Sequence, residues 1–192
     1  MIFLAFIGGM VAVFLALPAE EYVFKLYGLT EYTILLWAFI EEFLKYFLAY
    51  VLVLRSTNNN EPVDPVIYMI TAALGFAALE NTLFLIDPIM LGHTAQSLIT
   101  GNLRFIGATL LHILASGTLG TLLGFAFYRA RWIKQTATIF GLIIATALHT
   151  LFNLFIMNSD GSSVFLVFVS VWSGIIFLIL LFERVKRVYL HN

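Results

Sequence analysis

The chain has 192 residues, of which 61% are hydrophobic and 11% are charged, and its formal net charge is −1. A soluble domain is usually about half apolar and about a quarter charged, so this composition indicates a protein that crosses the membrane several times. The near-zero net charge argues against nucleic acid as a partner. The sequence has no cysteine, which excludes disulfides, thiolate nucleophiles and thiolate metal ligands.

The N-terminal apolar run is predicted to be a retained first helix. No Lys or Arg precedes it, and Pro18 stands where a signal peptide would have a small cleavage-site residue. We expect the helix to end near Pro18 because proline interrupts helical hydrogen bonding. Residues 19–31 mix charges with tyrosines and are predicted to lie at the membrane interface.

Several apolar stretches approach the roughly 20 residues that cross a bilayer. Polar segments with turn residues separate them, notably residues 55–65, 92–102 and 158–163. The sequence therefore predicts an all-α bundle of about six transmembrane helices in a single domain, residues 1–192, with both termini on the same side. The expected spans lie at about residues 2–17, 32–54, 66–86, 103–128, 136–157 and 164–182.

The distribution of Lys and Arg predicts the orientation of this multi-pass cell-membrane protein. The end that carries both termini receives Arg55, Arg129, Arg131, Lys134, Arg184, Lys186 and Arg187. The opposite end receives Lys25 and, at its margin, Arg104. Cytoplasmic loops are enriched in Lys and Arg, so we expect both termini in the cytoplasm.

Ionisable side chains inside four of the spans fall at one depth. Each costs a few kcal/mol in a bilayer unless it faces a protein interior or a wet cavity. At 1.5 Å per residue, Glu41 lies roughly 15 Å from the outer end, Glu80 roughly 10 Å, His112 roughly 13 Å and His149 roughly 12 Å. These depths predict a shared polar cavity in the outer half of the membrane.

Helical spacing suggests how the polar groups divide. Residues four apart share a face, so Glu41 pairs with Lys45, and His149 with Asn153. Glu42 points about 100° away from Glu41 and is expected to serve a different partner. Lys45 can neutralise one carboxylate and leave the other as a general base for water. An imidazole or the Asn153 amide can donate to a developing oxyanion.

Each of these groups also has a purely structural interpretation. Glu41 and Lys45 could form an intrahelical ion pair. A single interior histidine such as His149 is more often structural than catalytic. Ser116, one turn after His112, is typical of a packing position between helices. The coincidence of four helices at one depth favours a functional site over these separate explanations.

Four short motifs resemble those of PrsW-type membrane proteases. EEFLK (41–45) resembles their EExxK motif, and FAALEN (76–81) resembles FxxxEN. His112 with Gly120 fits HxxxxxxxG, and HTLFN (149–153) fits HxxxN/D. Their order over residues 41–153 makes the resemblance specific. The family is regarded as glutamate-dependent intramembrane proteases, distantly related to the CAAX prenyl proteases.

The resemblance implies an enzyme that cuts membrane-anchored proteins, such as an anti-sigma factor, near the outer face. Glu41 would activate water, with Glu42 beside it and Lys45 and Asn81 in support. No metal or other cofactor is expected in this mechanism. The remaining residues that the resemblance places in the same site are Glu80, His112, His149 and Asn153.

Two other functions remain open from the residues themselves. Glu and His side chains from several helices could hold Zn²⁺ or another divalent ion in a metal-dependent hydrolase, although the sequence lacks HExxH. Buried Glu, His and Lys also occur in proton- or ion-coupled carriers, but here the inner half of the spans is largely apolar. The sequence does not indicate an oligomeric state.

Overall fold

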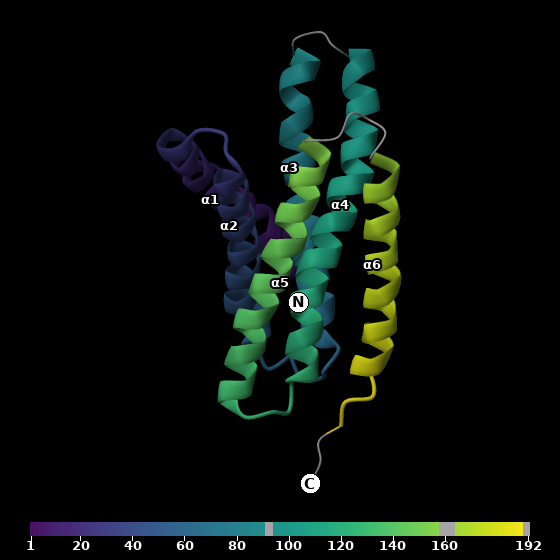
Figure 1. Ribbon diagram of the computed structural model, residues 1–192. Helices are drawn as coiled ribbons and strands as arrows, with labels where there is room; N and C mark the ends of the chain where they lie inside the picture. Colours follow the sequence, from purple (N-terminus) through teal and green to yellow (C-terminus); the bar gives the residue numbers. More distant parts are fainter. Residues whose placement is uncertain (91–93, 158–163, 190–192) are drawn as a thin grey trace.

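The computed structural model describes residues 1–90, 94–157 and 164–189, without the side chains of residues 87–89, 94–105 and 164. All regular secondary structure of the described residues is helical, with no strand, which confirms the all-α prediction. Successive helices alternate in direction (Figure 1). The elements are α1 (Ile2–Tyr27), α2 (Glu31–Ala49), a π-helical turn (Tyr50–Leu54), α3 (Asp64–Met90), α4 (Thr94–Phe125), α5 (Arg131–Met157) and α6 (Val164–Val185).

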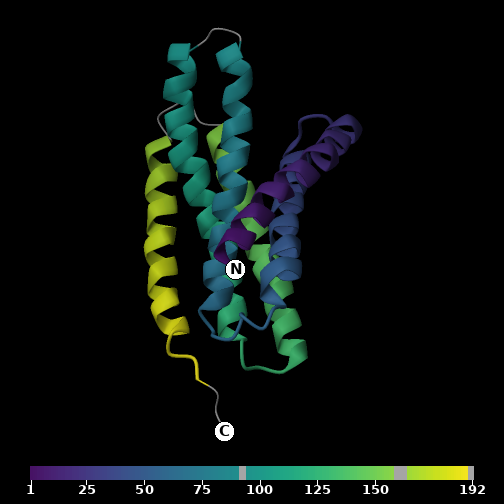
Figure 2. The same ribbon diagram turned by 180° about the vertical axis from the view of Figure 1, so that it is seen from behind.

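Five helices are long and apolar enough to cross a membrane, namely α1, α3, α4, α5 and α6 within the described ranges. Helix α2 differs because Glu41, Glu42 and Lys45 lie in its second half. It nevertheless packs against α1 and α5 within the bundle (Figures 1 and 2). Helix α2 can carry these charges because Glu41, Glu42 and Lys45 are buried against other helices.

Several predicted helix boundaries are wrong, including the end of α3, which continues to Met90 and not only to residue 86. Helix α1 does not end at Pro18 but continues to Tyr27, through the stretch expected at the interface. A proline in a membrane helix costs one hydrogen bond that neighbouring groups can compensate. Helix α4 begins at Thr94, so residues 94–102 are not a loop, and α5 begins at Arg131. The upper parts of α3 and α4 run side by side (Figures 1 and 2). Residues 92–93 of the expected loop and the side chain of Arg104 lie outside the described residues.

The start of α1 and the end of α6 lie toward the end of the bundle that carries the α2–α3 and α4–α5 connections. The Met1 sulfur is 4.0 Å from the Ser56 hydroxyl oxygen in the α2–α3 connection. The segment after α6 leaves the bundle at this end (Figures 1 and 2). We call this the basic end, because Arg55, Arg129 and Arg131 lie in or beside these connections.

Glycines allow the helices to approach closely. A Cβ atom on Gly9 of α1 would overlap the backbone of Ala72 in α3, and one on Gly75 would overlap the backbone of Phe6. Small residues at such crossings are typical of membrane bundles, where packing replaces the hydrophobic driving force. The α1–α3 crossing therefore fixes the first half of α1, while its second half reaches away from α3 (Figure 2).

A tight turn sets where α2 begins. Gly28 has φ 64°, a conformation that favours glycine, and makes the reversal after α1. Thr30 caps α2 by accepting a hydrogen bond from the Thr33 backbone N–H at 3.2 Å. The Thr33 hydroxyl donates back to the Gly28 carbonyl at 2.7 Å. These bonds help fix the start of the helix that carries Glu41 and Glu42.

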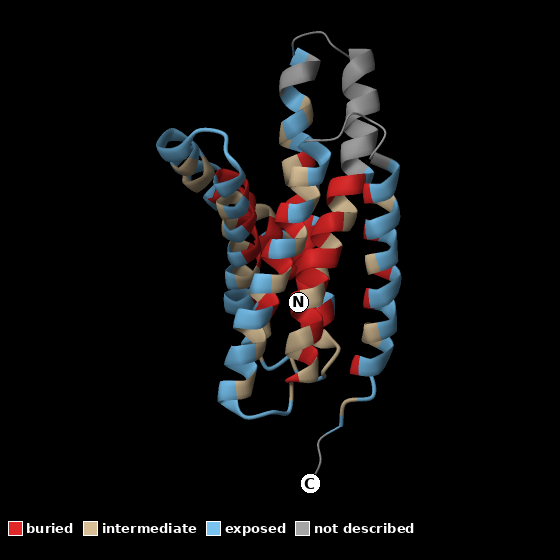
Figure 3. Ribbon diagram, in the orientation of Figure 1, coloured by how far each residue is buried: buried red, intermediate tan, exposed pale blue. Residues whose placement is uncertain are grey.

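Buried residues concentrate in the middle of the bundle, where the helices pack against one another (Figure 3). On the side of the basic end, an apolar cluster fills the space between α1, α2, α3 and α4. Its buried members are Ala5, Ala49, Val53, Tyr68, Met69, Ala72 and Leu119. The polar site described below is closed off by this cluster in the direction of the basic end.

Two adjacent glycines test the α1–α3 crossing. Gly9→Ala is expected to destabilise the fold by about 1–3 kcal/mol, because the new methyl group meets backbone that cannot move aside. Gly8→Ala is the matched control, since its methyl group meets the flexible tip of Leu52. Thermal unfolding in detergent should give a clearly lower Tm for Gly9→Ala. Equal Tm values for the two variants would contradict the close backbone contact.

Candidate active site

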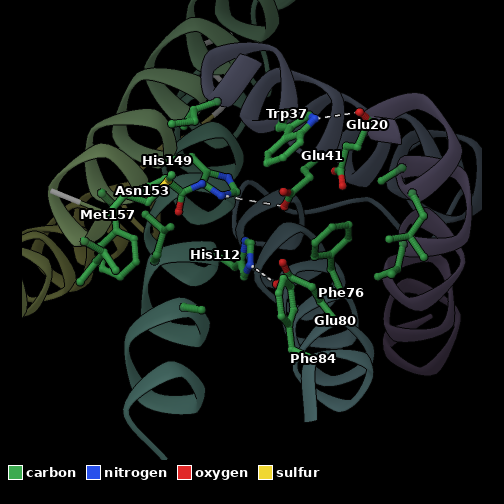
Figure 4. Close-up of a pocket in the computed structure, with 18 of the residues that line it drawn as sticks. Glu20, Trp37, Glu41, Phe76, Glu80, Phe84, His112, His149, Asn153 and Met157 are labelled. Atoms are coloured by element: carbon green, nitrogen blue, oxygen red, sulfur yellow. Dashed lines mark hydrogen bonds and ion pairs between the residues drawn. The ribbon is translucent and has the colours of Figure 1, made fainter. Parts of the chain in front are cut away.

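A cavity of about 640 Å³ lies among the helices, with walls from α1, α2, α3, α4, α5 and α6. Its polar groups come from five helices, α1 to α5, and converge on the cavity (Figure 4). The rest of the lining is mainly apolar and aromatic, the usual character of a ligand pocket with a few oriented polar groups. The polar lining residues are Glu20, Glu41, Glu80, His112, His149 and Asn153.

Glu42 lies behind the cavity wall and binds three other helical residues. Lys45 Nζ donates to its Oε1 at 2.5 Å, and both side chains are fully buried. The Ser116 hydroxyl donates to Oε2 at 2.7 Å. His149 Nδ1 lies 3.1 Å from Oε1. A buried charge is tolerable when it is paired and hydrogen-bonded in this way, so Glu42 ties α2 to α4 and α5.

The same lysine determines the tautomer of His112. Lys45 Nζ is 2.9 Å from His112 Nδ1, and an ammonium group can only donate. Nδ1 must therefore accept, which places the ring proton on Nε2. This N–H donates to Glu80 Oε2 at 3.0 Å. His112 is thus a neutral imidazole with both nitrogens engaged.

His149 has the opposite arrangement. The ionised Glu42 carboxylate can only accept, so His149 donates from Nδ1. In the neutral ring this leaves a lone pair on Nε2, which lies 3.9 Å from Glu41 Oε2. The two imidazole rings meet edge to face, with centroids 5.0 Å apart.

Glu41 has a carboxylate oxygen that remains available. Its Oε2 is buried and has no hydrogen-bond partner among the described residues, and Lys45 Nζ is 3.9 Å away. An unsatisfied buried polar atom costs about 1–3 kcal/mol. The side chain lines the cavity (Figure 4), so this cost is explained if Oε2 binds something inside the cavity.

The structure brings most of the sequence-predicted site residues to one place. Five line the cavity, whereas Glu42 and Lys45 lie directly behind it. Asn81 is elsewhere: it is absent from the lining, and its amide donates to the Thr109 hydroxyl at 3.2 Å. The five lining residues are Glu41, Glu80, His112, His149 and Asn153. Their chemical roles stay predictions.

Two lining residues with groups that can bind a ligand, Glu20 and Trp37, were not predicted from the sequence. Glu20 was assigned to the interface because α1 was expected to end at Pro18. With the helix continued, residues 13, 16, 17 and 20 recur at the spacing of one helical face, and all four line the cavity. Trp37 precedes Glu41 by one turn on α2, so the same spacing could have placed it beside Glu41.

Comparison with known proteins identifies the family of this chain. The model of the family described as "PrsW family intramembrane metalloprotease" matches residues 1–181. The chain belongs to the PrsW family. Curated relatives named Protease PrsW include one from Halalkalibacterium halodurans, 26% identical over 122 residues, which are 62% of this chain and 51% of the relative.

Two further Protease PrsW sequences are similar. The one from Geobacillus kaustophilus is 32% identical over 95 residues, 50% of this chain and 37% of the relative. The one from Bacillus subtilis is 30% identical over 115 residues, which are 58% of this chain and 47% of the relative. The matched part of the chain thus spans about half or less of each curated relative. No solved structure matches the chain.

The PrsW family description names a metalloprotease, and the donor atoms here fit a divalent ion. Glu41, His112 and His149 each offer a ligand atom, and these atoms lie within 4.8 Å of one another at buried positions. Carboxylate and imidazole donors suit zinc and related metals. Glu41 Oε2 and His149 Nε2 are not engaged in hydrogen bonds. His112 would have to give up one of its two hydrogen bonds.

The two adjacent glutamates should differ in their effect on stability. Glu42→Gln removes the charge that compensates buried Lys45, so we expect a loss of about 3–5 kcal/mol in the free energy of unfolding. Glu41→Gln removes no hydrogen bond at Oε2 and should change stability by less than about 1 kcal/mol. Thermal unfolding of both variants in detergent tests this. Equal destabilisation would contradict the division of roles.

Proposed function

We propose that this protein is an intramembrane endopeptidase that hydrolyses peptide bonds of membrane-anchored proteins with water activated by Glu41. The observation that carries the proposal is the unsatisfied Glu41 Oε2 in the cavity wall, with His149 Nε2 3.9 Å away. Membership of the PrsW family supports the same reaction class. The relationship to the CAAX prenyl proteases stays a prediction.

Proton transfer begins at Glu41 in this mechanism. A water molecule in the cavity gives its proton to the carboxylate while its oxygen attacks the substrate carbonyl carbon. The free lone pair of His149 Nε2 can accept that proton from Glu41 and later return it to the leaving amine. Glu42 holds the ring in this tautomer through Nδ1 and stabilises the imidazolium that forms.

The developing oxyanion requires a donor on the cavity wall. The Asn153 amide lines the cavity one turn after His149 and can donate in every protonation state. His112 already donates to Glu80. The His112–Glu80 pair can orient water and pass protons on its own side of the cavity. A metal held by Glu41, His112 and His149 would supply a Lewis acid in place of some of this hydrogen bonding.

The cavity rim suits a substrate that arrives from the membrane. The exposed lining residues are large and apolar: Leu17 on α1, Phe84 on α3, and Ile156 and Met157 on α5. A helical substrate would have to unwind locally, because its backbone hydrogen bonds otherwise shield the peptide bonds. A single-span protein such as an anti-sigma factor has this form.

The carrier alternative receives less support. A transport path has to continue to both sides of the membrane, whereas the apolar cluster around Met69, Ala72 and Leu119 fills the bundle on the side of the basic end. The described polar groups of the site stop at Lys45 and Ser116, which are both committed to Glu42. This arrangement favours a one-sided cavity over a conduit.

We also propose that the basic end faces the cytoplasm, which puts the catalytic cavity in the outer half of the membrane. The absence of native cysteine makes this easy to measure. Thr57→Cys lies at the basic end and Leu29→Cys at the opposite end, and both positions are exposed. In intact cells, a membrane-impermeant maleimide should label only Leu29→Cys. Labelling of Thr57→Cys alone would reverse the orientation.

Cleavage by purified protein tests the catalytic proposal. In nanodiscs with a panel of single-span substrates, Glu41→Gln should lower kcat about 10²–10⁴-fold, the usual contribution of a general base. Glu31→Gln is the control, because this carboxylate is exposed at the start of α2 and does not line the cavity. Cleavage by Glu41→Gln at the wild-type rate would overturn the mechanism.

The same assay decides whether a metal takes part. Chelator should leave the wild-type rate unchanged if Glu41 acts without metal. Loss of activity, restored by a stoichiometric divalent ion, would instead assign a metal to Glu41, His112 and His149. The amount of metal bound to purified wild type and to Glu41→Gln can also be compared, and this comparison does not depend on activity. A metal held by Glu41 should be bound less by Glu41→Gln.

A further inference from the structure

Glu20 is a second carboxylate in the cavity that the proposed reaction does not use. It lies on the face of α1 that also carries Val13, Ala16 and Leu17, and this whole face lines the cavity. No hydrogen bond or ion pair to its carboxylate occurs among the described residues, whereas its neighbour Glu21 points outward and pairs with Lys25 at 2.6 Å. Two adjacent acidic residues on one helix are thus in different environments.

Trp37 is held beside Glu20. Its indole N–H donates to the Glu20 backbone carbonyl at 3.0 Å, which joins α2 to α1 next to Glu41 (Figure 4). The indole ring is a lining residue too. A carboxylate and an indole that line one cavity suit a cation, because the first supplies charge and the second a polarisable ring face.

The charge of the cavity also suits a cation. The described lining contains carboxylates and no Lys or Arg side chain. Lys45 lies behind the wall and is committed to Glu42 and His112. Independently of Glu20, the Glu41 side chain is only 8% exposed, and its Oε2 faces the cavity without a hydrogen-bond partner. A cationic group that entered would find acceptors that no described residue satisfies.

We propose that Glu20 and Trp37 form a subsite for a Lys or Arg side chain of the substrate, close to the bond that is cut. The inference rests on the proposed protease function and adds a substrate class to it: membrane-anchored segments with a basic residue near the cleavage site. The long alkyl stem of Lys or Arg can pass the apolar rim at Leu17 while its charged end reaches Glu20.

The experiment compares matched single-span substrates that differ at one position, Lys against Gln, scanned along the outer third of the span. For wild type in nanodiscs, we expect kcat/KM to favour the Lys substrate about tenfold at one or two positions. Glu20→Gln should bring this ratio close to one. Glu21→Gln, the adjacent exposed carboxylate, should retain it. A purely structural role of Glu20 would lower both rates and leave the ratio unchanged.

A charge reversal and a binding measurement complete the test. Glu20→Lys should prefer a substrate with Glu at the same position. Binding of the Lys and Gln substrates to Glu41→Gln protein, with and without Glu20→Gln, separates this inference from the protease proposal. Tighter binding of the Lys substrate that depends on Glu20 supports the subsite even if no substrate is cut. Equal binding, or a wild-type cleavage ratio near one at every position, overturns it.

Discussion

The buried ion pair between Glu42 and Lys45 is the interaction on which the site depends. Because both side chains are fully buried, neither charge is tolerable without the other. The pair also recruits Ser116 and His149 to Glu42 and His112 to Lys45. It therefore joins α2, α4 and α5 and holds both imidazoles at the cavity. Glu41 needs no separate anchor, since one peptide bond links it to a residue with three hydrogen-bonded partners.

Much of this arrangement could be predicted from the sequence, because charges inside apolar helices allow few solutions. The depth of Glu41, Glu80, His112 and His149 predicted that they would share a cavity, and helical spacing separated Glu42 from Glu41. The partners of each residue could not be predicted in the same way. Spacing gives the face of one helix, whereas the contact between Ser116 and Glu42 depends on how two helices are rotated against each other.

The errors have identifiable physical causes. Pro18 was expected to end α1, but the helix tolerates one missing hydrogen bond and continues to Tyr27. That single boundary removed Glu20 from consideration, because the residue was assigned to the interface. Polar composition likewise predicted a loop where α4 has already begun at Thr94. In both places, the chain continues as helix through residues that locally favour an end or a loop.

The two histidines make the cavity asymmetric even though they are chemically the same. Lys45 leaves His112 with its proton on Nε2, and Glu42 leaves His149 with its proton on Nδ1. One wall therefore presents a bound hydrogen, shared with Glu80, and the other a bare nitrogen beside Glu41. The two walls of the cavity therefore differ in their hydrogen bonding because of an ion pair, Glu42 with Lys45, that lies outside the lining.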